Sequence, residues 1–240
     1  MSNMKALPYK MLGGVTPCPG GWLILPARLA GVTVIVEEPM VVKTLVEVLE
    51  YKPKFEAAAI YAPVGFEDEP AGPYRPCDDE ARDMVGWPRL VAIKPTPSRA
   101  ALHAPTRDKA QEIEPWLTSD DLRRFKWIRE AEAEFQPFHQ RNWFAGHPDL
   151  SFYVLNGDRP VTSSPYQPDG VLERMNLIKA KLPGVEEAVV ATPPPGAGQI
   201  HLLQCAGLLW TARRAAGRAV NRLPMDPNWD TTGLRMELVR

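Results

Sequence analysis

The N-terminal part of the chain alternates short apolar runs with turn residues. An apolar run ends at Val15, a Pro- and Gly-rich stretch occupies 16–21, and two β-rich segments follow at 22–25 and 32–36. Short apolar runs separated by Pro and Gly are typical of successive strands joined by turns. The pattern therefore predicts three strands with a sharp bend at 16–21. Thr16 would then stand at the end of a central strand, where sheet-based sites present their chemistry.

The next two elements extend this pattern into an α/β fold. Apolar residues recur at helical spacing from Pro39 to about Tyr51, which predicts a first helix. The run at 57–62 is continuously apolar, as expected of a buried strand. We therefore expect one domain over 1–240 with a mixed sheet of about five strands flanked by helices. Its first three strands would be antiparallel, and the fourth would lie beside the first.

Later in the chain, capping residues and helical spacing predict further helices. The segment 150–155 is assigned to a helix because Asp149 sits at a cap-like position. Because the segment is rich in β-forming residues, a strand is kept as the alternative. Pro-rich stretches between these elements predict long ordered loops. The remaining expected elements are helices 78–85, 98–103, 118–135, 170–182 and 199–223, and strands 142–145 and 233–239.

Composition limits the classes of partner. The 240 residues contain 28 Lys and Arg against 29 Asp and Glu, for a net charge of -1. Such a balance gives no general attraction to nucleic acid or to a membrane surface, so any such binding needs a local patch. The N-terminus has no apolar segment of signal-peptide length, and no run approaches a membrane span. These features favour a cytoplasmic protein without membrane contact.

The three cysteines and two of the histidines raise the question of a zinc site. The cysteines are widely spaced and form no CxxC pair, so buried, reduced thiols are the favoured interpretation. In the predicted fold these residues could still approach one edge of the sheet, and thiolate and imidazole ligands suit Zn²⁺. The candidate ligands are Cys18, Cys77, His147, His201 and Cys205.

Several motifs together resemble family 429 of the domains of unknown function, a set of predicted nucleases placed with the ribonuclease H-like fold. Each motif is weak alone, but their shared order extends over nearly the whole chain. The resemblance implies a ribonuclease H-like domain with long loop insertions. The matching segments are CPGGW at 18–22, PVG at 63–65, RPCD at 75–78, PSRAAL at 97–102, HPDLSF at 147–152, LNG at 155–157, ER at 173–174, WTA at 210–212 and GLRME at 233–237.

The same resemblance implies acidic residues at positions where this chain has none. In the family pattern, acids that hold two metal ions end the first and fourth strands, precede the HPD-like motif and open the late helix. This chain has Thr16, Tyr61 and Ala145 at the first three places, and His201 and Gln204 near the fourth. These side chains bring no negative charge to balance Mg²⁺. The parental two-metal mechanism should therefore not operate, and no cofactor is expected.

Two functional hypotheses follow. The first is a pseudo-nuclease, a non-catalytic module for binding or assembly. The alternative is a nuclease or other phosphodiester hydrolase that uses altered ligands with Mg²⁺ or Mn²⁺. Its candidate catalytic residues are Asp78, His147 and Asp149, although acids in a first helical turn and a histidine in a turn commonly have structural roles.

Arginines in the family-matching loops suggest what a non-catalytic site would bind. Arg75, Arg82 and Arg99 are expected near Thr16 and Tyr61, where they could contact a phosphate-bearing ligand or nucleic acid. A protein partner is also left open.

A second group of arginines lies in the last predicted helix. Arg214, Arg218 and Arg222 are spaced by four and would share one helix face, with Arg213 alongside. The face is interpreted as solvated, with a phosphate-contacting stripe as the alternative.

Overall fold

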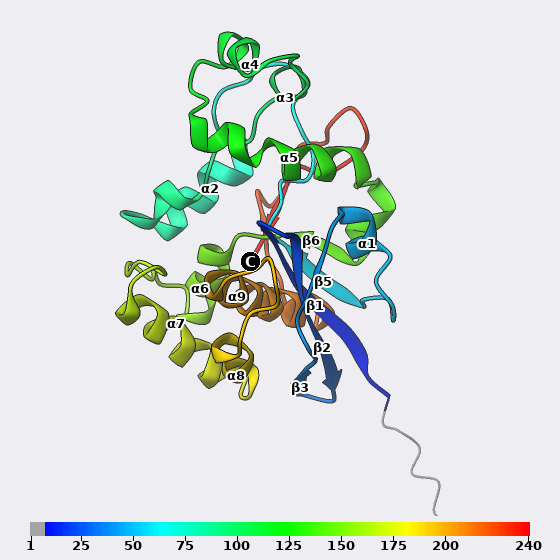
Figure 1. The fold of residues 1–240 in the computed structure, drawn as a ribbon, viewed down its shortest axis with the longest axis vertical. Helices are drawn as coiled ribbons and strands as arrows, with labels where there is room; N and C mark the ends of the chain where they lie inside the picture. The colour runs from blue at the N-terminus through cyan, green and yellow to red at the C-terminus, as the bar shows by residue number, and fades with distance from the viewer. Residues whose placement is uncertain (1–7) are drawn as a thin grey trace, which may run out of the picture.

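A computed structural model describes residues 8–240 of the protein. Its central feature is a mixed sheet with the strand order β3-β2-β1-β5-β6 (Figure 1). A further strand, β4, pairs with β2. The strands are β1 (Lys10–Cys18), β2 (Gly21–Ala30), β3 (Thr33–Val36), β4 (Met40–Val42), β5 (Ala57–Ile60) and β6 (Trp143–Ala145).

The pairing of the strands agrees with the fold predicted from the sequence. β1 with β2 and β2 with β3 are antiparallel, whereas β5 lies parallel to β1 with Gly14 opposite Ala59. β6 then extends the sheet in parallel with β5. The predicted mixed sheet, with three antiparallel strands and the fourth beside the first, is confirmed.

The first hairpin is tighter than predicted. Thr16 lies inside β1 and pairs with Leu23, so the turn is confined to Pro19 and Gly20 rather than extending over 16–21. Gly21 begins β2 with a φ of 133°, and a Cβ atom built there would lie 2.1 Å from the carbonyl oxygen of Val42. A residue with a side chain could not bring β4 so close to the turn.

The segment after Pro39 is only partly helical. Met40–Val42 forms β4 against β2, and the helix α1 is limited to Leu45–Leu49. The helix begins late because Thr44 caps it, with its hydroxyl accepting the N–H of Glu47 at 3.4 Å. The apolar residues of 40–42 thus belong to a strand, which helical spacing alone did not distinguish.

The rest of the chain is mostly helical. Between β5 and β6 are α2 (Pro76–Val85), η1 (Arg89–Ala92), α3 (Arg99–Leu102), α4 (Arg107–Ile113), α5 (Ser119–Glu134) and η2 (Pro137–Arg141). After β6 come α6 (Pro148–Leu155), α7 (Pro168–Lys181), α8 (Val185–Val190), α9 (Gln199–Ala216), β7 (Arg222–Leu223) and β8 (Leu238–Val239). The helices α4 and α8 were not predicted.

Three boundaries differ from the prediction. The helix α9 ends at Ala216 rather than 223, because the backbone turns at Gly217 and Arg218 has a φ of 56°. The segment 150–155 is helical, but its N-cap is His147 instead of Asp149. The predicted tail strand shortens to β8, which pairs with β7 outside the main sheet.

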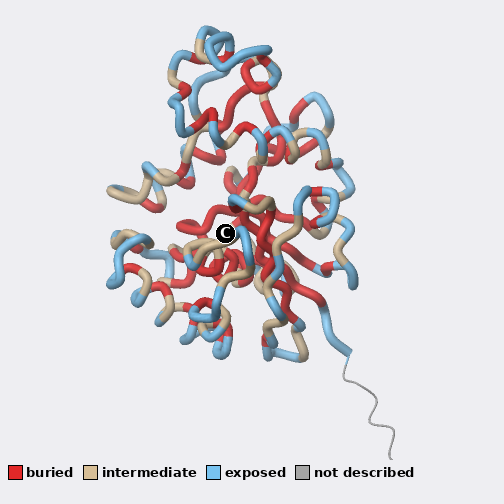
Figure 2. Tube along the Cα trace, in the orientation of Figure 1, coloured by how far each residue is buried: buried red, intermediate tan, exposed pale blue. Residues whose placement is uncertain are grey.

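Helices cover both faces of the sheet. Helices α6 to α9 gather on one side and α1 lies on the other (Figure 1). Buried residues concentrate along the central strands (Figure 2). The helix α9 comes unusually close to β1, since a Cβ atom on Gly14 would lie 2.1 Å from the carbonyl oxygen of Cys205. The absence of a side chain at Gly14 therefore lets this helix lie directly on the central strand.

A smaller apolar cluster holds α3, α4 and the first half of α5 together. Among its members are Phe66, Leu102, Ala110, Leu122 and Phe125. Within the described residues, no helix combines the length and the apolar character needed to span a membrane.

Candidate functional site

The positions at which the resemblance implied carboxylates meet at one edge of the sheet. Thr16 lies near the end of β1, Tyr61 directly follows β5, and Ala145 ends β6. Because these three strands are neighbours, their ends lie side by side. On the covering helix α9, Gln204 accepts a hydrogen bond of 3.0 Å from the Thr16 hydroxyl.

A cavity of about 350 Å³ opens at this edge, between η1 and the segment that leads into α7. Tyr61, His147 and Gln204 line it, together with apolar side chains that include Phe152 and Leu203. Its charged lining consists of four cations and one carboxylate: Arg89, Lys94, Arg124, Arg174 and Asp149. The wall is therefore predominantly positive.

Asp149 holds two of these cations in place. Arg89 donates to both of its carboxylate oxygens, at 3.2 and 2.8 Å, and Arg174 donates to Oδ1 at 3.1 Å. Burial would raise the pKa of Asp149, but the hydrogen bonds from Arg89 and the nearby positive charges outweigh it and lower the pKa. Asp149 is thus an ionised anchor for arginines, with its oxygens already occupied.

His147 is fixed by the backbone on both sides of its ring. Its Nδ1 accepts the N–H of Asp149 at 3.1 Å, and Nε2 lies 3.2 Å from the carbonyl oxygen of Ala92. The ring meets Tyr61 edge-on with centroids 4.8 Å apart. Burial lowers the pKa of His147, so the neutral form dominates at neutral pH. Because both ring nitrogens already have partners, His147 is suited to capping α6 rather than to transferring protons.

Lys94 and Arg124 are the cations of this wall without a strong carboxylate partner. Lys94 forms no ion pair within residues 8–240. Arg124 lies 3.7 Å from Asp121 and donates to the carbonyl oxygen of Pro95 at 3.4 Å, both long contacts. Their charges remain available to an anion in the cavity.

The residues at this edge do not fit a pair of magnesium ions. Mg²⁺ needs hard, anionic oxygen ligands, whereas Thr16 and Gln204 bond to each other and Tyr61 keeps its proton because burial raises its pKa. Four cationic side chains around the same cavity would also repel a metal ion.

Comparison with known proteins gives a family for the chain. A family model described as "Protein of unknown function (DUF429)" matches residues 14–228. The chain belongs to the DUF429 family. No curated protein and no solved structure matches it. The match includes every residue that lines the cavity.

The candidate zinc ligands of this DUF429 protein do not form a site. Within residues 8–240, no three His, Cys, Asp or Glu side chains lie close enough to hold a metal ion. Cys18 and Cys205 belong to the apolar core beneath α9, and Cys77 belongs to the core on the opposite face of the sheet. Burial raises the pKa of Cys77 to about 12, so it is a protonated thiol. His201 accepts the N–H of Gly198 at 2.9 Å at the start of α9.

The three arginines predicted to contact an anion make internal bonds instead. Arg75 is buried and pairs with Asp78 at 2.9 Å, while Arg82 donates to the carbonyl oxygens of Leu90 and Ile93. Arg99 forms ion pairs with carboxylates at 2.7, 3.0 and 2.7 Å, those of Asp68, Glu132 and Asp230. These contacts argue against an anion-binding role for all three. They also make Asp78 a structural partner of Arg75 in the first turn of α2.

The arginine stripe of the DUF429 chain is also not formed. Arg214 lies on α9, but Arg218 follows the end of the helix and Arg222 belongs to β7. Arg222 pairs with Glu237 at 3.3 Å. The predicted common helix face does not exist because the helix ends before its second member.

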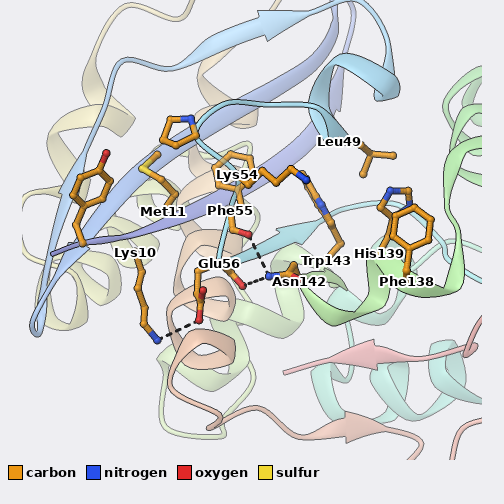
Figure 3. Close-up of a pocket in the computed structure, with 12 residues that line it drawn as sticks. Lys10, Met11, Leu49, Lys54, Phe55, Glu56, Phe138, His139, Asn142 and Trp143 are labelled. Carbon is orange, nitrogen blue, oxygen red and sulfur yellow. Dashed lines mark hydrogen bonds and ion pairs between the residues drawn. The ribbon is translucent and has the colours of Figure 1, made fainter.

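Another cavity, of about 570 Å³, lies at the opposite ends of the same strands (Figure 3). Its polar groups largely bond to each other: Lys10 pairs with Glu56 at 3.3 Å, and Asn142 donates to the carbonyl oxygens of Phe55 and Glu56. This cavity is not surrounded by four cations as the cavity at the other edge is, so it is the weaker candidate for an anion site.

The four cations that line the cavity beside Tyr61 and Gln204 were not identified from the sequence. Arg89 and Lys94 come from the η1 segment, Arg124 from α5 and Arg174 from α7. Only tertiary folding unites three separated segments over the strand ends. The motif ER at 173–174 was the sole signal, and it carried no chemical meaning by itself.

Proposed function

We propose that the protein is a non-catalytic binding module whose cavity takes a small, phosphate-bearing ligand. The charge of the wall carries the proposal: four cations and one carboxylate stand where a metal-dependent nuclease needs clustered acids. Guanidinium and ammonium groups are the usual protein partners of phosphate oxygens.

The surroundings of these cations favour binding of an anion. Asp149 neutralises only part of the charge of Arg89 and Arg174. Arg124 has only a long ion pair, at 3.7 Å from Asp121, and Lys94 forms none within residues 8–240. Apolar walls at Phe152 and Leu203 limit access of water and so strengthen charge interactions. As part of the same proposal the protein is cytoplasmic, in agreement with its three free, buried cysteines.

The proposal is tested by calorimetry and thermal melting with inorganic phosphate, adenosine monophosphate and a short single-stranded oligonucleotide. Binding should raise the melting temperature, and the shift should fall as salt increases. Lys94→Gln and Arg124→Gln should each weaken binding about tenfold, because each removes one charge-assisted contact. Arg123→Gln is the matched control, since Arg123 is the exposed neighbour on the same helix, 67% accessible.

The oligonucleotide distinguishes a nucleic-acid module from a small-molecule module. Preference for the mononucleotide supports the proposal as stated, whereas much tighter binding of the oligonucleotide would make nucleic acid the partner. Absence of binding by all three probes, or equal losses in Arg123→Gln and Lys94→Gln, would reject an anion site. A role in protein assembly would then be the remaining non-catalytic hypothesis.

A separate assay addresses catalysis. The protein is incubated with labelled single- and double-stranded nucleic acid and Mg²⁺, Mn²⁺ or Zn²⁺. We expect no cleavage above buffer, because the donor set for two metals is missing. Metal-dependent cleavage that is abolished by His147→Ala or Asp78→Ala would overturn the non-catalytic proposal in favour of a hydrolase with altered ligands.

A further inference from the structure

A second cavity, separate from the proposed anion site, lies beside the first turn of α2. Its volume of about 360 Å³ falls within the roughly 300–1,000 Å³ typical of small-molecule sites. Three carboxylates line it, those of Glu67, Asp79 and Glu114. None of them forms an ion pair with another residue of 8–240.

The one cation in the lining does not neutralise these carboxylates. Arg75 donates to both carboxylate oxygens of Asp78, at 2.9 and 3.0 Å, and its remaining terminal nitrogen donates to the carbonyl oxygens of Val64 and Gly65. Its charge and hydrogen bonds are therefore directed away from the cavity. The N-terminal end of α2 offsets part of the charge of Asp79, but only a fraction of one unit.

Glu114 is the residue that most requires a partner. Its side chain belongs to a residue that is 1% exposed, and Oε1 accepts the N–H of Ser98 at 3.1 Å. Its Oε2 has no hydrogen-bond partner within the described chain. Burial raises the pKa of Glu114, and the N–H and hydroxyl groups of Ser98 offset this only in part. A buried carboxylate oxygen without a donor is costly, and a positive group in the adjoining cavity would remove that cost.

The spacing of the carboxylates decides between an inorganic and an organic cation. No three His, Cys, Asp or Glu side chains in residues 8–240 lie close enough together for a metal ion. A molecule that carries several N–H donors on a carbon chain can instead reach carboxylates that stand apart. We propose that this cavity binds a small organic cation, an alkylammonium or guanidinium compound, with Glu114 at its inner end and Glu67 and Asp79 at its sides.

The test is calorimetric titration of the full chain with agmatine and with 1,4-diaminobutane, using 1,4-butanediol as the uncharged counterpart. Saturable binding of the amines and none of the diol is expected. Glu114→Gln should weaken amine binding about tenfold or more, because one buried charge is lost. The substitution retains an oxygen to accept the Ser98 N–H, so the fold should persist. Glu67→Gln and Asp79→Asn should weaken binding without touching the buried network.

Glu112→Gln provides the matched control, because Glu112 lies on α4, which Glu114 directly follows, and its side chain is 61% exposed and pairs with Lys109. Its amine affinity should equal that of the wild type. The inference is overturned if neither amine gives saturable binding, if the diol binds as well as the amines, or if Glu114→Gln and both rim variants bind like the wild type. Binding of Mg²⁺ in place of the amines would likewise reject it. Failure here leaves the anion site untouched, because the two sites share none of the substituted residues.

Discussion

The hydroxyl of Thr16 donates a hydrogen bond of 3.0 Å to the side-chain oxygen of Gln204. This contact joins the central strand β1 to the helix α9 at the edge where the family resemblance implied two carboxylates. Thr16 is fully buried. Two neutral groups therefore satisfy each other there, and the site holds together without the repulsion that a cation would have to relieve.

Removal of divalent ions should leave the stability of the protein unchanged. No clustered carboxylates at the strand ends depend on a metal, so EDTA should not shift the melting temperature. Scanning calorimetry with and without EDTA checks this expectation. A melting temperature that falls by several degrees and recovers when Mg²⁺ is added would contradict it, since unrecognised ligands would then hold a metal.

Thr16→Val should destabilise the fold by about 1 kcal/mol, because the oxygen of Gln204 loses its donor at nearly unchanged volume. Thr16→Ser keeps the hydroxyl and serves as the control for the hydrogen bond. Urea unfolding of the two variants measures the difference. Equal stability of the Val and Ser variants would show that the bond contributes nothing.

Asp149→Asn should destabilise the fold by about 3 kcal/mol at pH 7, since it leaves the buried guanidinium of Arg174 without its anion. The pKa of Asp149 is lowered in the folded protein. Its contribution is therefore complete above the unfolded value of about 3.9 and is lost as the pH falls through the lower folded value. The gap between wild type and variant should close below about pH 4.

Urea unfolding at a series of pH values measures this gap. Asp158→Asn is the control, because Asp158 pairs with Arg240 at the surface with its side chain 61% exposed. Its effect should stay within about 0.5 kcal/mol. A gap for Asp149→Asn that persists unchanged into acid would show that charge is not its cause.

Gly14→Ala should destabilise the protein by about 2 kcal/mol or more, because the added methyl group overlaps the backbone of α9 and the helix must shift. Gly198→Ala is a suitable comparison, as its nearest contact would be 3.6 Å away on a side chain. Thermal melting of both variants decides the point. Similar melting temperatures of the two variants would mean that α9 can shift away from Gly14 with little loss of stability.

The strands β1, β2, β3, β5 and β6 could be predicted from the sequence because each carries its own local signal. The apolar run before Val15, the buried run at 57–62 and the turn at Pro19 and Gly20 are local features, and topology followed from their order. The strand β4 was missed because three apolar residues fit a helix as well as a strand. Its identity depends on pairing with β2, which is a tertiary contact.

The candidate site was predicted in part for the same reason. Thr16 lies near the end of β1 and Tyr61 directly follows the neighbouring strand β5, so their placement at one edge of the sheet follows from the topology. The cations that line the cavity come from the η1 segment, α5 and α7. No local sequence pattern predicts that these segments lie close together. Family motifs pointed to Arg75 and Arg99, whose partners Asp78 and Asp230 became visible only in the folded chain.

Arg99 connects three parts of the chain that lie far apart in sequence: the loop at Asp68, the helix α5 at Glu132 and the C-terminal segment at Asp230. Asp230 also accepts the backbone N–H groups of Phe66 and Leu234. Detachment of either the loop or the C-terminal segment would remove one of the three carboxylate partners of the largely buried Arg99. We therefore expect local opening to be coupled across this junction, so that the backbone amides on both sides exchange their hydrogens with solvent together.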